Sequence, residues 1–297
     1  MTMRITNRMM VDLAVRRMND RLTQFESSQR QLATGKRIQV ASDDVAGMNT
    51  VLEVTSSLAS NTQAQRNASD GIVWTEMADS RLAGIGDQLH RIRDLVVEAN
   101  NAANGPSGYS AISTEIGQLA ESIRSVANSR HQARPVFGGF VGDDPVQSVA
   151  GAWSYQGDGG AIMRRVSENE LVQVNVTGDE VFGFNAGEDL FTMLDGLVTN
   201  IGSGASTRLD TELQRVDRAL ERILAGRASA GASRNRLDAA GVRAAADEVN
   251  LRTELSETLH ADMAAAIMEM QIQEVAYQAA QGALSKSLQS SLAQFLR

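Results

Sequence analysis

Hydrophobic residues near both ends of the chain recur at steps of three and four, which is the spacing of one helix face. The first such stripe comprises Met18, Leu22, Phe25 and Leu32. Further along, a regular alternation of three- and four-residue steps predicts a heptad seam of Leu82, Ile85, Leu89, Ile92, Val96 and Ala99. A third stripe comprises Ile112, Ile116, Leu119, Ile123 and Val126. The amino-terminal half is therefore predicted to be helical.

Polar and glycine-containing segments divide these helices. Residues Thr34 to Arg37 interrupt the first stripe. Ser42 then comes directly before Asp43 and Asp44. This order predicts Ser42 as the N-cap of the next helix, with the two acids in its first turn, where the helix dipole favours them. Residues 100–108 are rich in turn formers and predict another break.

The middle of the chain, residues 135–187, has a different pattern. Glycine-rich breaks separate short runs in which apolar and polar residues alternate, as in Val172, Val174 and Val176. A similar run, Val181 to Phe184, follows a Gly-Asp turn and is also predicted to be extended. Seven of the twelve aromatic residues lie between Phe137 and Phe191. We therefore expect a small β-rich module here.

Helical spacing then returns in Leu209, Leu213, Val216, Leu220 and Ile223. After an expected interruption at Gly226 to Gly231, one helical seam is predicted from about Ser233 to Phe295. It comprises Val242, Ala245, Val249, Leu259, Met263, Ala266, Met270, Tyr277, Ala280, Leu284 and Leu288. Sixty helical residues extend about 90 Å. Because a compact globule of this size cannot enclose such a helix, it needs partners along its length.

The predicted fold is mainly α, with a long antiparallel coiled-coil rod formed by both termini and a small β-rich domain inserted in the middle. Residues 1–42 and 256–297 are predicted as terminal helices that depend on assembly. Residues 43–134 and 188–255 are predicted as a helical bundle core, and residues 135–187 as the β-rich outer module.

The carboxy-terminal seam is weak, because alanine and serine stand where leucine or isoleucine would bury more surface. In an isolated pair of such helices, the small buried surface is expected to offset poorly the conformational entropy that is lost on folding. Packing among many copies would stabilise it, and we predict that folding is completed on assembly. The residues predicted to form the assembly interface are Leu22, Phe25, Leu32, Tyr277, Leu284, Leu288, Leu292, Phe295 and Leu296.

Composition excludes several classes of function. The net charge of -8 argues against nucleic-acid binding, which needs a basic surface. No apolar run approaches the roughly 18 residues that span a bilayer, so no membrane partner is expected. The start, Met1 to Met10, lacks the apolar region of a cleavable secretory signal. Composition alone therefore predicts a soluble cytosolic protein.

No residue pattern predicts catalysis, a metal site or a cofactor. The chain has no cysteine. Its three histidines, His90, His131 and His260, lie far apart without ligand spacing. Asp43 and Asp44 are adjacent, and neighbouring residues on a helix do not converge on one ligand. We expect a non-enzymatic protein without catalytic residues, metal ligands or a cofactor.

Three amino-terminal segments resemble the region shared by flagellins and the hook-associated protein 3 family. They are MRITNRMM (3–10), QLATGKRI (31–38) and ASDDVAG (41–47). Ala41 departs from this resemblance, because junction proteins of the family usually have proline there. Flagellin itself therefore stays an alternative.

Later segments are also similar to this family. GASRNRL (231–237) resembles the opening of its long carboxy-terminal helix. The segments QEVAYQAA (273–280) and SLAQFLR (291–297) are more similar to junction proteins than to flagellins, as are VFGGF (136–140) and DLFTML (189–194).

The resemblance implies a structural part of the bacterial flagellum that connects the hook to the flagellin filament. Its implied partners are hook-associated protein 1, flagellin, further copies of itself in a ring, and an export chaperone. It implies export through the flagellar type III channel, unfolded and without cleavage, to an extracellular position at the hook–filament junction. A regulatory coiled-coil protein is a further alternative, which would require a membrane span or a sensor module.

Overall fold

The structure is a computed structural model that describes residues 7–100, 105–149, 151–204 and 209–295. Contacts divide the chain into two units, one formed by residues 1–59 and 248–297, the other by residues 60–247. Both divisions fall within a helix, in α2 (Val45–Ala99) and in α6 (Leu209–Leu259). The division into terminal, core and outer sections stays a prediction.

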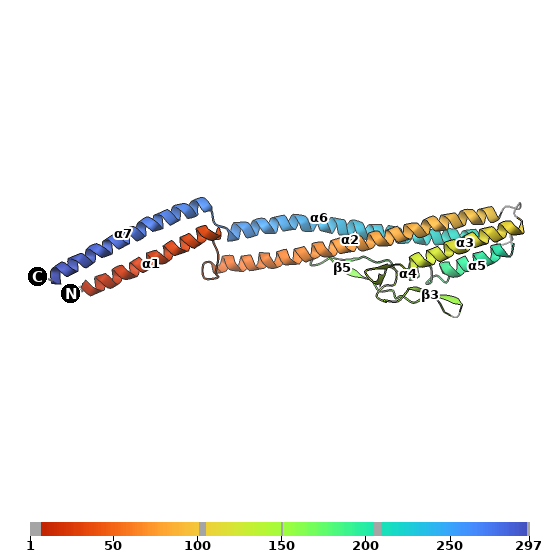
Figure 1. The fold of residues 1–297 in the computed structure, drawn as a ribbon, viewed down its shortest axis with the longest axis horizontal. Helices are drawn as coiled ribbons and strands as arrows, with labels where there is room; N and C mark the ends of the chain where they lie inside the picture. Colours follow the sequence, from red (N-terminus) through yellow and green to blue (C-terminus); the bar gives the residue numbers. More distant parts are fainter. Residues whose placement is uncertain (1–6, 101–104, 150, 205–208, 296–297) are drawn as a thin grey trace. The chain divides into compact units, whose positions relative to one another are not determined.

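In the first unit, α1 (Asn7–Thr34) and α7 (Met263–Phe295) pack side by side and run antiparallel (Figure 1). The predicted break after Thr34 is confirmed. Gly35 has a φ of +68° and donates its N–H to the carbonyl of Gln31 at 2.9 Å, so it closes the last turn of α1. The predicted fold class is confirmed in its essentials: helical termini that pair, and an insertion with short antiparallel strands.

The predicted N-cap of α2 is wrong by two residues. Asp44, not Ser42, accepts a hydrogen bond from the N–H of Gly47 at 2.9 Å, and the helix begins at Val45. Asp43 accepts from the loop that precedes it. Three consecutive residues could each cap a helix, and sequence spacing alone does not distinguish among them.

In the second unit, α2 and α6 lie together with α3 (Pro106–Ala127) and α5 (Leu190–Gly202) (Figure 1). The heptad seam predicted from Leu82 to Ala99 is fully buried, as predicted. On α3, Leu119 and Val126 are only half-buried, whereas Ala120 and Ala127 are buried. Helices α3 and α5 pack against each other.

The inserted segment contains three antiparallel two-stranded pairs. They are β1 (Arg130–His131) with β2 (Arg134–Pro135), β3 (Val146–Val149) with β4 (Ala152–Tyr155), and β5 (Met163–Arg165) with β6 (Leu171–Gln173). In the two longer pairs, Val146 lies opposite Tyr155 and Met163 opposite Gln173. Val172, Val174 and Val176 are buried as their alternation predicts, although only Val172 lies in a strand.

The run from Val181 to Phe184 is not extended, contrary to expectation. Val181 ends a short helix, α4 (Gly178–Val181), and Phe182 is its C-cap. The acids Asp179 and Glu180 stand in its first turn, where they favour a helix. Gly178 donates to the carbonyl of Phe137 at 3.0 Å, and this contact fixes the turn.

Aromatic side chains join the insertion to the helices. The ring centroids of Phe137 and Phe182 lie 5.4 Å apart, and those of Phe182 and Phe191 lie 5.5 Å apart, both with edge-to-face geometry. Phe191 belongs to α5 and Phe137 to the insertion. The inserted segment and the helical bundle therefore share one hydrophobic core.

Two predictions about the carboxy-terminal half are wrong. No break occurs at Gly226 to Gly231, because α6 continues through both glycines. The single seam from Ser233 to Phe295 is instead divided, since α6 ends at Leu259 and α7 begins at Met263. Asp262 caps α7 by accepting from the N–H groups of Ala264 and Ala265.

The inner face of α6 also differs from the predicted seam. Val242 and Val249 are exposed, whereas Leu237, Ala240 and Ala244 are buried. Both stripes follow helical spacing, and spacing alone does not distinguish Val242 and Val249 from Ala240 and Ala244.

Gly226 and Gly231 of α6 should respond oppositely to alanine. A Cβ at Gly226 would lie 2.8 Å from Cγ2 of Val181, whereas one at Gly231 meets nothing within 4 Å. Gly231→Ala should stabilise the fold by about 1 kcal/mol through helix propensity. Gly226→Ala gains the same propensity but forces a shift that costs about 1–3 kcal/mol. Urea unfolding of both variants measures the difference, and an equal stabilisation by both would contradict the close packing at Gly226.

Candidate functional site

The loops that connect α1 to α2 and α6 to α7 cross each other within the first unit. We call this feature the loop crossing and define it as residues 35–38 and 258–261. Arg37 donates its N–H to the carbonyl of Leu259 at 2.8 Å, and Ala261 donates to the carbonyl of Gly35 at 2.9 Å. Lys36 and His260 form an isolated antiparallel bridge between these bonds. Backbone hydrogen bonds thus join the end of α1 to the start of α7.

Ile38 packs the loop crossing against the first turn of α2. Its side chain is 1% exposed, although the neighbouring residues on both sides are more open. A Cβ at Gly47 would lie 2.4 Å from Cδ1 of Ile38. Glycine at position 47 therefore provides the space that Ile38 occupies.

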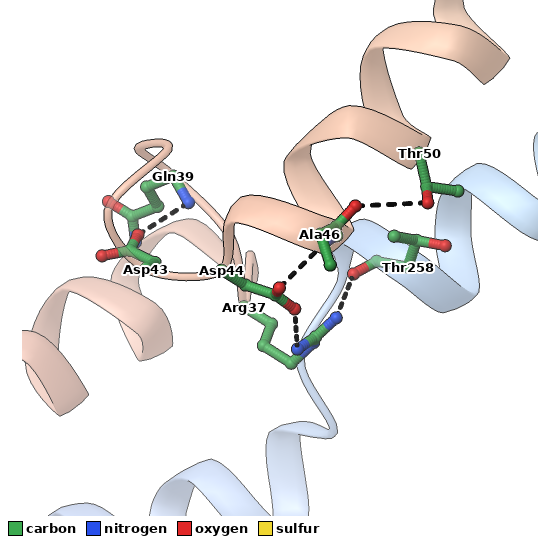
Figure 2. A network of polar contacts seen from close by, with 8 residues as sticks. Arg37, Gln39, Asp43, Asp44, Ala46, Thr50 and Thr258 are labelled. Atoms are coloured by element: carbon green, nitrogen blue, oxygen red, sulfur yellow. Dashed lines mark hydrogen bonds and ion pairs between the residues drawn. The ribbon is translucent and has the colours of Figure 1, made fainter.

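Arg37 connects the loop crossing to the N-cap of α2 through its guanidinium. Its Nη1 lies 3.0 Å from Oδ2 of Asp44, and its Nη2 donates to the carbonyl of Thr258 at 3.0 Å. Figure 2 shows the Arg37 side chain reaching both groups. The other carboxylate oxygen of Asp44 accepts from the N–H of Gly47. One arginine thereby ties the N-cap of α2 to the last turn of α6.

Asp43 fixes the remainder of the loop. Its Oδ2 accepts from the N–H of Gln39 at 3.0 Å and from the N–H of Val40 at 3.1 Å, and Figure 2 shows the Gln39 bond. These backbone donors lower the pKa of Asp43 below its ordinary value. The pKa of Asp44 is lowered by the N–H of Gly47 first and by the Arg37 side chain second. Both carboxyl groups are therefore ionised near neutral pH.

The predicted interface residues occupy the paired terminal helices where the structure describes them. Leu22, Phe25 and Leu32 on α1 are half-buried, as are Tyr277 and Leu284 on α7. The side chains of Leu288, Leu292 and Phe295 lie outside the described part, and so does the whole of Leu296. Their role in assembly stays a prediction.

The pairing of α1 with α7 buries little. Among the described side chains of these two helices, only Ser28 and Ala266 are buried. Large apolar side chains stay exposed along α7, including Ile267, Ile272 and Val275. Much of the apolar surface of the pair is therefore available to other molecules.

The loop crossing does not follow from the sequence pattern. That pattern predicts Asp43 and Asp44 as acids in the first turn of a helix and assigns no role to Arg37 or Ile38. A signal is present, since GKRI, followed closely by DD and a glycine, places a cation, two acids and a small residue in one loop. The partner segment at Thr258 has no comparable signal, because its spacing predicts the interior of a helix.

The three histidines stay separate. His131 stacks edge-on against Trp74, with centroids 5.7 Å apart, and Nδ1 of His260 lies 3.0 Å from Oγ of Ser256. Within the described ranges, no three acidic or histidine side chains gather as metal ligands. Of the helices that the structure describes, none is long and apolar enough to cross a membrane.

Two family models match this chain on either side of the inserted segment. The bacterial flagellin N-terminal helical region matches residues 5–131, and the bacterial flagellin C-terminal helical region matches residues 213–296. Together they span well over half of the chain. The chain belongs to the flagellin family. The loop crossing is made from both matched regions of this flagellin-family chain, residues 35–38 from the first and residues 258–261 from the second.

Individual relatives agree with this assignment. The flagellin of Halalkalibacterium halodurans is 26% identical over 280 residues, which cover 93% of this chain and 92% of that protein. The FlgL structure of Xanthomonas campestris has a TM-score of 0.62 at 20% identity and covers 68% of this chain and 99% of that one. Hook-associated protein 3 of Legionella pneumophila has a TM-score of 0.65 at 14% identity, covering 70% and 98%. These structures share the fold of this flagellin-family chain.

The loop around Asp43 should open in acid. A group whose folded-state pKa is lowered stabilises the fold fully above its ordinary pKa, which is 3.8 here, and this contribution is lost as the pH falls through the folded value. Exchange of the Gln39 and Val40 amides, corrected for intrinsic rates, should therefore accelerate as the pH falls below about 4. Asp43→Asn should abolish this pH dependence. Equal protection across that range in the unmodified chain would show that the carboxylate does not hold the loop.

The terminal pair should be the first part of the free chain to open, because so few of its described side chains are buried. Limited trypsin digestion should cut at Arg16, Arg17 and Arg30 in α1 and at Lys286 in α7 before any site in residues 60–247. The resistant product should retain the aromatic insertion. If α1 and α7 resist digestion as long as the second unit does, their stability does not depend on assembly.

Proposed function

We propose that this flagellar structural protein connects the hook, through hook-associated protein 1, to the flagellin filament. The main support is the likeness to FlgL and hook-associated protein 3 structures, which are matched over almost their entire length. The role is structural, without catalysis. Its partners would be hook-associated protein 1, flagellin, further copies of the chain and an export chaperone, and its location the extracellular hook–filament junction.

The described surface suits such a role. A junction protein must offer apolar helix faces to unlike neighbours, and α7 leaves Ile267, Met268, Ile272 and Val275 exposed. These side chains and the half-buried seam of α1 and α7 would pack between copies in a ring. The predicted interface residues act there through burial, not through chemistry.

Flagellin is the second candidate, favoured by a different observation. The Halalkalibacterium halodurans flagellin matches this chain along 92% of its own length. A flagellin would add to itself without limit, whereas a junction protein presents different partners on its two sides. Growth of the purified protein into long filaments, seeded with its own fragments, would favour flagellin.

Loss of a junction protein should leave hooks without filaments. A strain lacking this chain should secrete flagellin monomers into the medium, and electron microscopy should show bare hooks. In the unmodified strain, immunogold label should form a band at the end of the hook. Label distributed along the whole filament would contradict the junction role and support flagellin.

A carboxylate in the α1–α7 seam should prevent assembly. Leu284 is half-buried on α7, and Gln281, one turn away, is exposed. Leu284→Asp should cost several kcal/mol once the seam is packed, because the buried charge has no partner. It should therefore reproduce the bare-hook phenotype, whereas Gln281→Asp should retain filaments. Both variants must be exported at normal levels, and normal filaments with Leu284→Asp would remove this residue from the interface.

A further inference from the structure

We propose that the loop crossing sets the register of α1 against α7. In this role it decides which residues of the two helices face each other, and hence where the exposed apolar side chains of the pair lie. The inference concerns the folding of one chain. It holds equally for a junction protein and for a filament protein, so its test is separate from that of the proposed function.

The seam between α1 and α7 has little power to select its own register. Its α7 side includes small residues such as Ala266 and Ala280, which fit many opposite neighbours. Gln273 is the central polar residue of that side, and a buried polar residue can specify register only when it finds a partner. Its Oε1 is buried without a hydrogen-bond partner among the described residues.

Polar contacts between α1 and α7 do not select a register either. Among the described residues, no ion pair or side-chain hydrogen bond joins α1 to α7, and the bonds of Arg21, Gln273 and Gln278 stay within their own helices. A slip along the seam would therefore break few specific interactions within the pair itself. The specific interactions lie in the loop crossing, at the base of both helices.

Counting from the loop crossing gives one consistent register. Gly35 and Ala261 are joined by a hydrogen bond, and α1 and α7 rise equally per residue in opposite directions. Side chains lean toward the start of their helix. On α1 they therefore lean away from the crossing, and on α7 they lean toward it. A residue of α1 should then meet a residue of α7 that lies about two positions farther from the crossing.

The burial pattern of both helices fits this rule. Ser28 lies seven positions before Gly35, and half-buried Met270 lies nine positions after Ala261. Among the described side chains of α1, the same rule pairs every half-buried or buried residue except Gln31 with a half-buried or buried residue of α7. The resulting layers are Leu32 with Ala266, Ser28 with Met270, Phe25 with Gln273, Leu22 with Tyr277, Met18 with Ala280, and Ala14 with Leu284.

The connections show which helix has room to slip. Three residues separate α6 from α7, whereas ten separate α1 from α2. The longer loop could move α1 along α7 if nothing held it. Arg37 and Ile38 hold it, through the bonds to Leu259 and Thr258 and through burial against Gly47.

Disulfide trapping in the full-length chain tests the register, and the natural absence of cysteine makes the design simple. One double variant, Ser28→Cys with Met270→Cys, reports the expected register. A second, Ser28→Cys with Tyr277→Cys, reports a slip of one heptad, which displaces the helices by about 10 Å. A disulfide requires Cα atoms within about 7 Å, so the two pairs do not form in the same register. Both are equilibrated in a glutathione redox buffer, and the ratio of cross-linked products is measured.

In the otherwise unmodified chain the Ser28–Met270 pair should dominate. Adding Arg37→Ala should raise the proportion of the Ser28–Tyr277 product about tenfold, the ratio that corresponds to about 1.4 kcal/mol. Asp44→Asn should give a smaller increase, because asparagine retains the cap and Arg37 retains its bond to Thr258. Arg16→Ala, a change of an exposed arginine on α1, should have no effect.

The ratio stays informative even when the helices open for part of the time, since each product reports only paired molecules. Two results would overturn the proposal. In one, the Ser28–Met270 pair dominates unchanged in the Arg37→Ala chain, so the seam selects its own register. In the other, both products fall together without a change in ratio, so the loop crossing stabilises the pair but does not align it.

Discussion

A long helix with a narrow apolar stripe cannot bury that stripe by itself, and this constraint governs the whole chain. In residues 60–247 the stripe of α2 packs into one core with residues of α3, α5, α6 and the insertion, so that the seam residues from Leu82 to Ala99 are buried. Edge-to-face aromatic contacts join the insertion and α5 within this core. Burial of large side chains supplies most of the stabilisation that folding needs. This part of the molecule is complete as a single chain.

The terminal helices satisfy the same constraint only in part. They cover one another along a seam of mostly half-buried side chains, and Ile272 and Val275 stay open to solvent. Charge-assisted hydrogen bonds are instead concentrated at the loop crossing and in the loop that follows it, where they involve Arg37, Asp43 and Asp44. The chain thus combines a buried hydrophobic core with a pair of terminal helices whose apolar surface stays partly exposed. A flagellar subunit that must join its neighbours has a use for both.

Much of the fold could be predicted from the sequence, because strong periodicity survives tertiary packing. The heptad seam of α2, the pairing of the helical termini and the position of the insertion all follow from spacing. The errors arise where spacing alone does not determine the structure. Gly226 looks like a helix breaker but serves as a point of close approach to Val181, which only tertiary contacts reveal. Conversely, Asp262 starts a new helix within an apparently continuous stripe, because one capping side chain can redirect the chain. The loop crossing combines residues remote in sequence, and local patterns carry no information on such pairings.

The bond from Arg37 to the carbonyl of Thr258 links residues separated by 221 positions. A contact between residues so far apart in sequence can form only when both segments, and hence almost the entire polypeptide, are present. A chain that lacks its last forty residues, or one that is still emerging from the ribosome, has the arginine but not the carbonyl it binds. In such a chain α1 lacks the contact that holds its end, and this end of the molecule stays unfolded. The end of the first helix can therefore be fixed only after the whole of α6 and the loop that follows it have been synthesised.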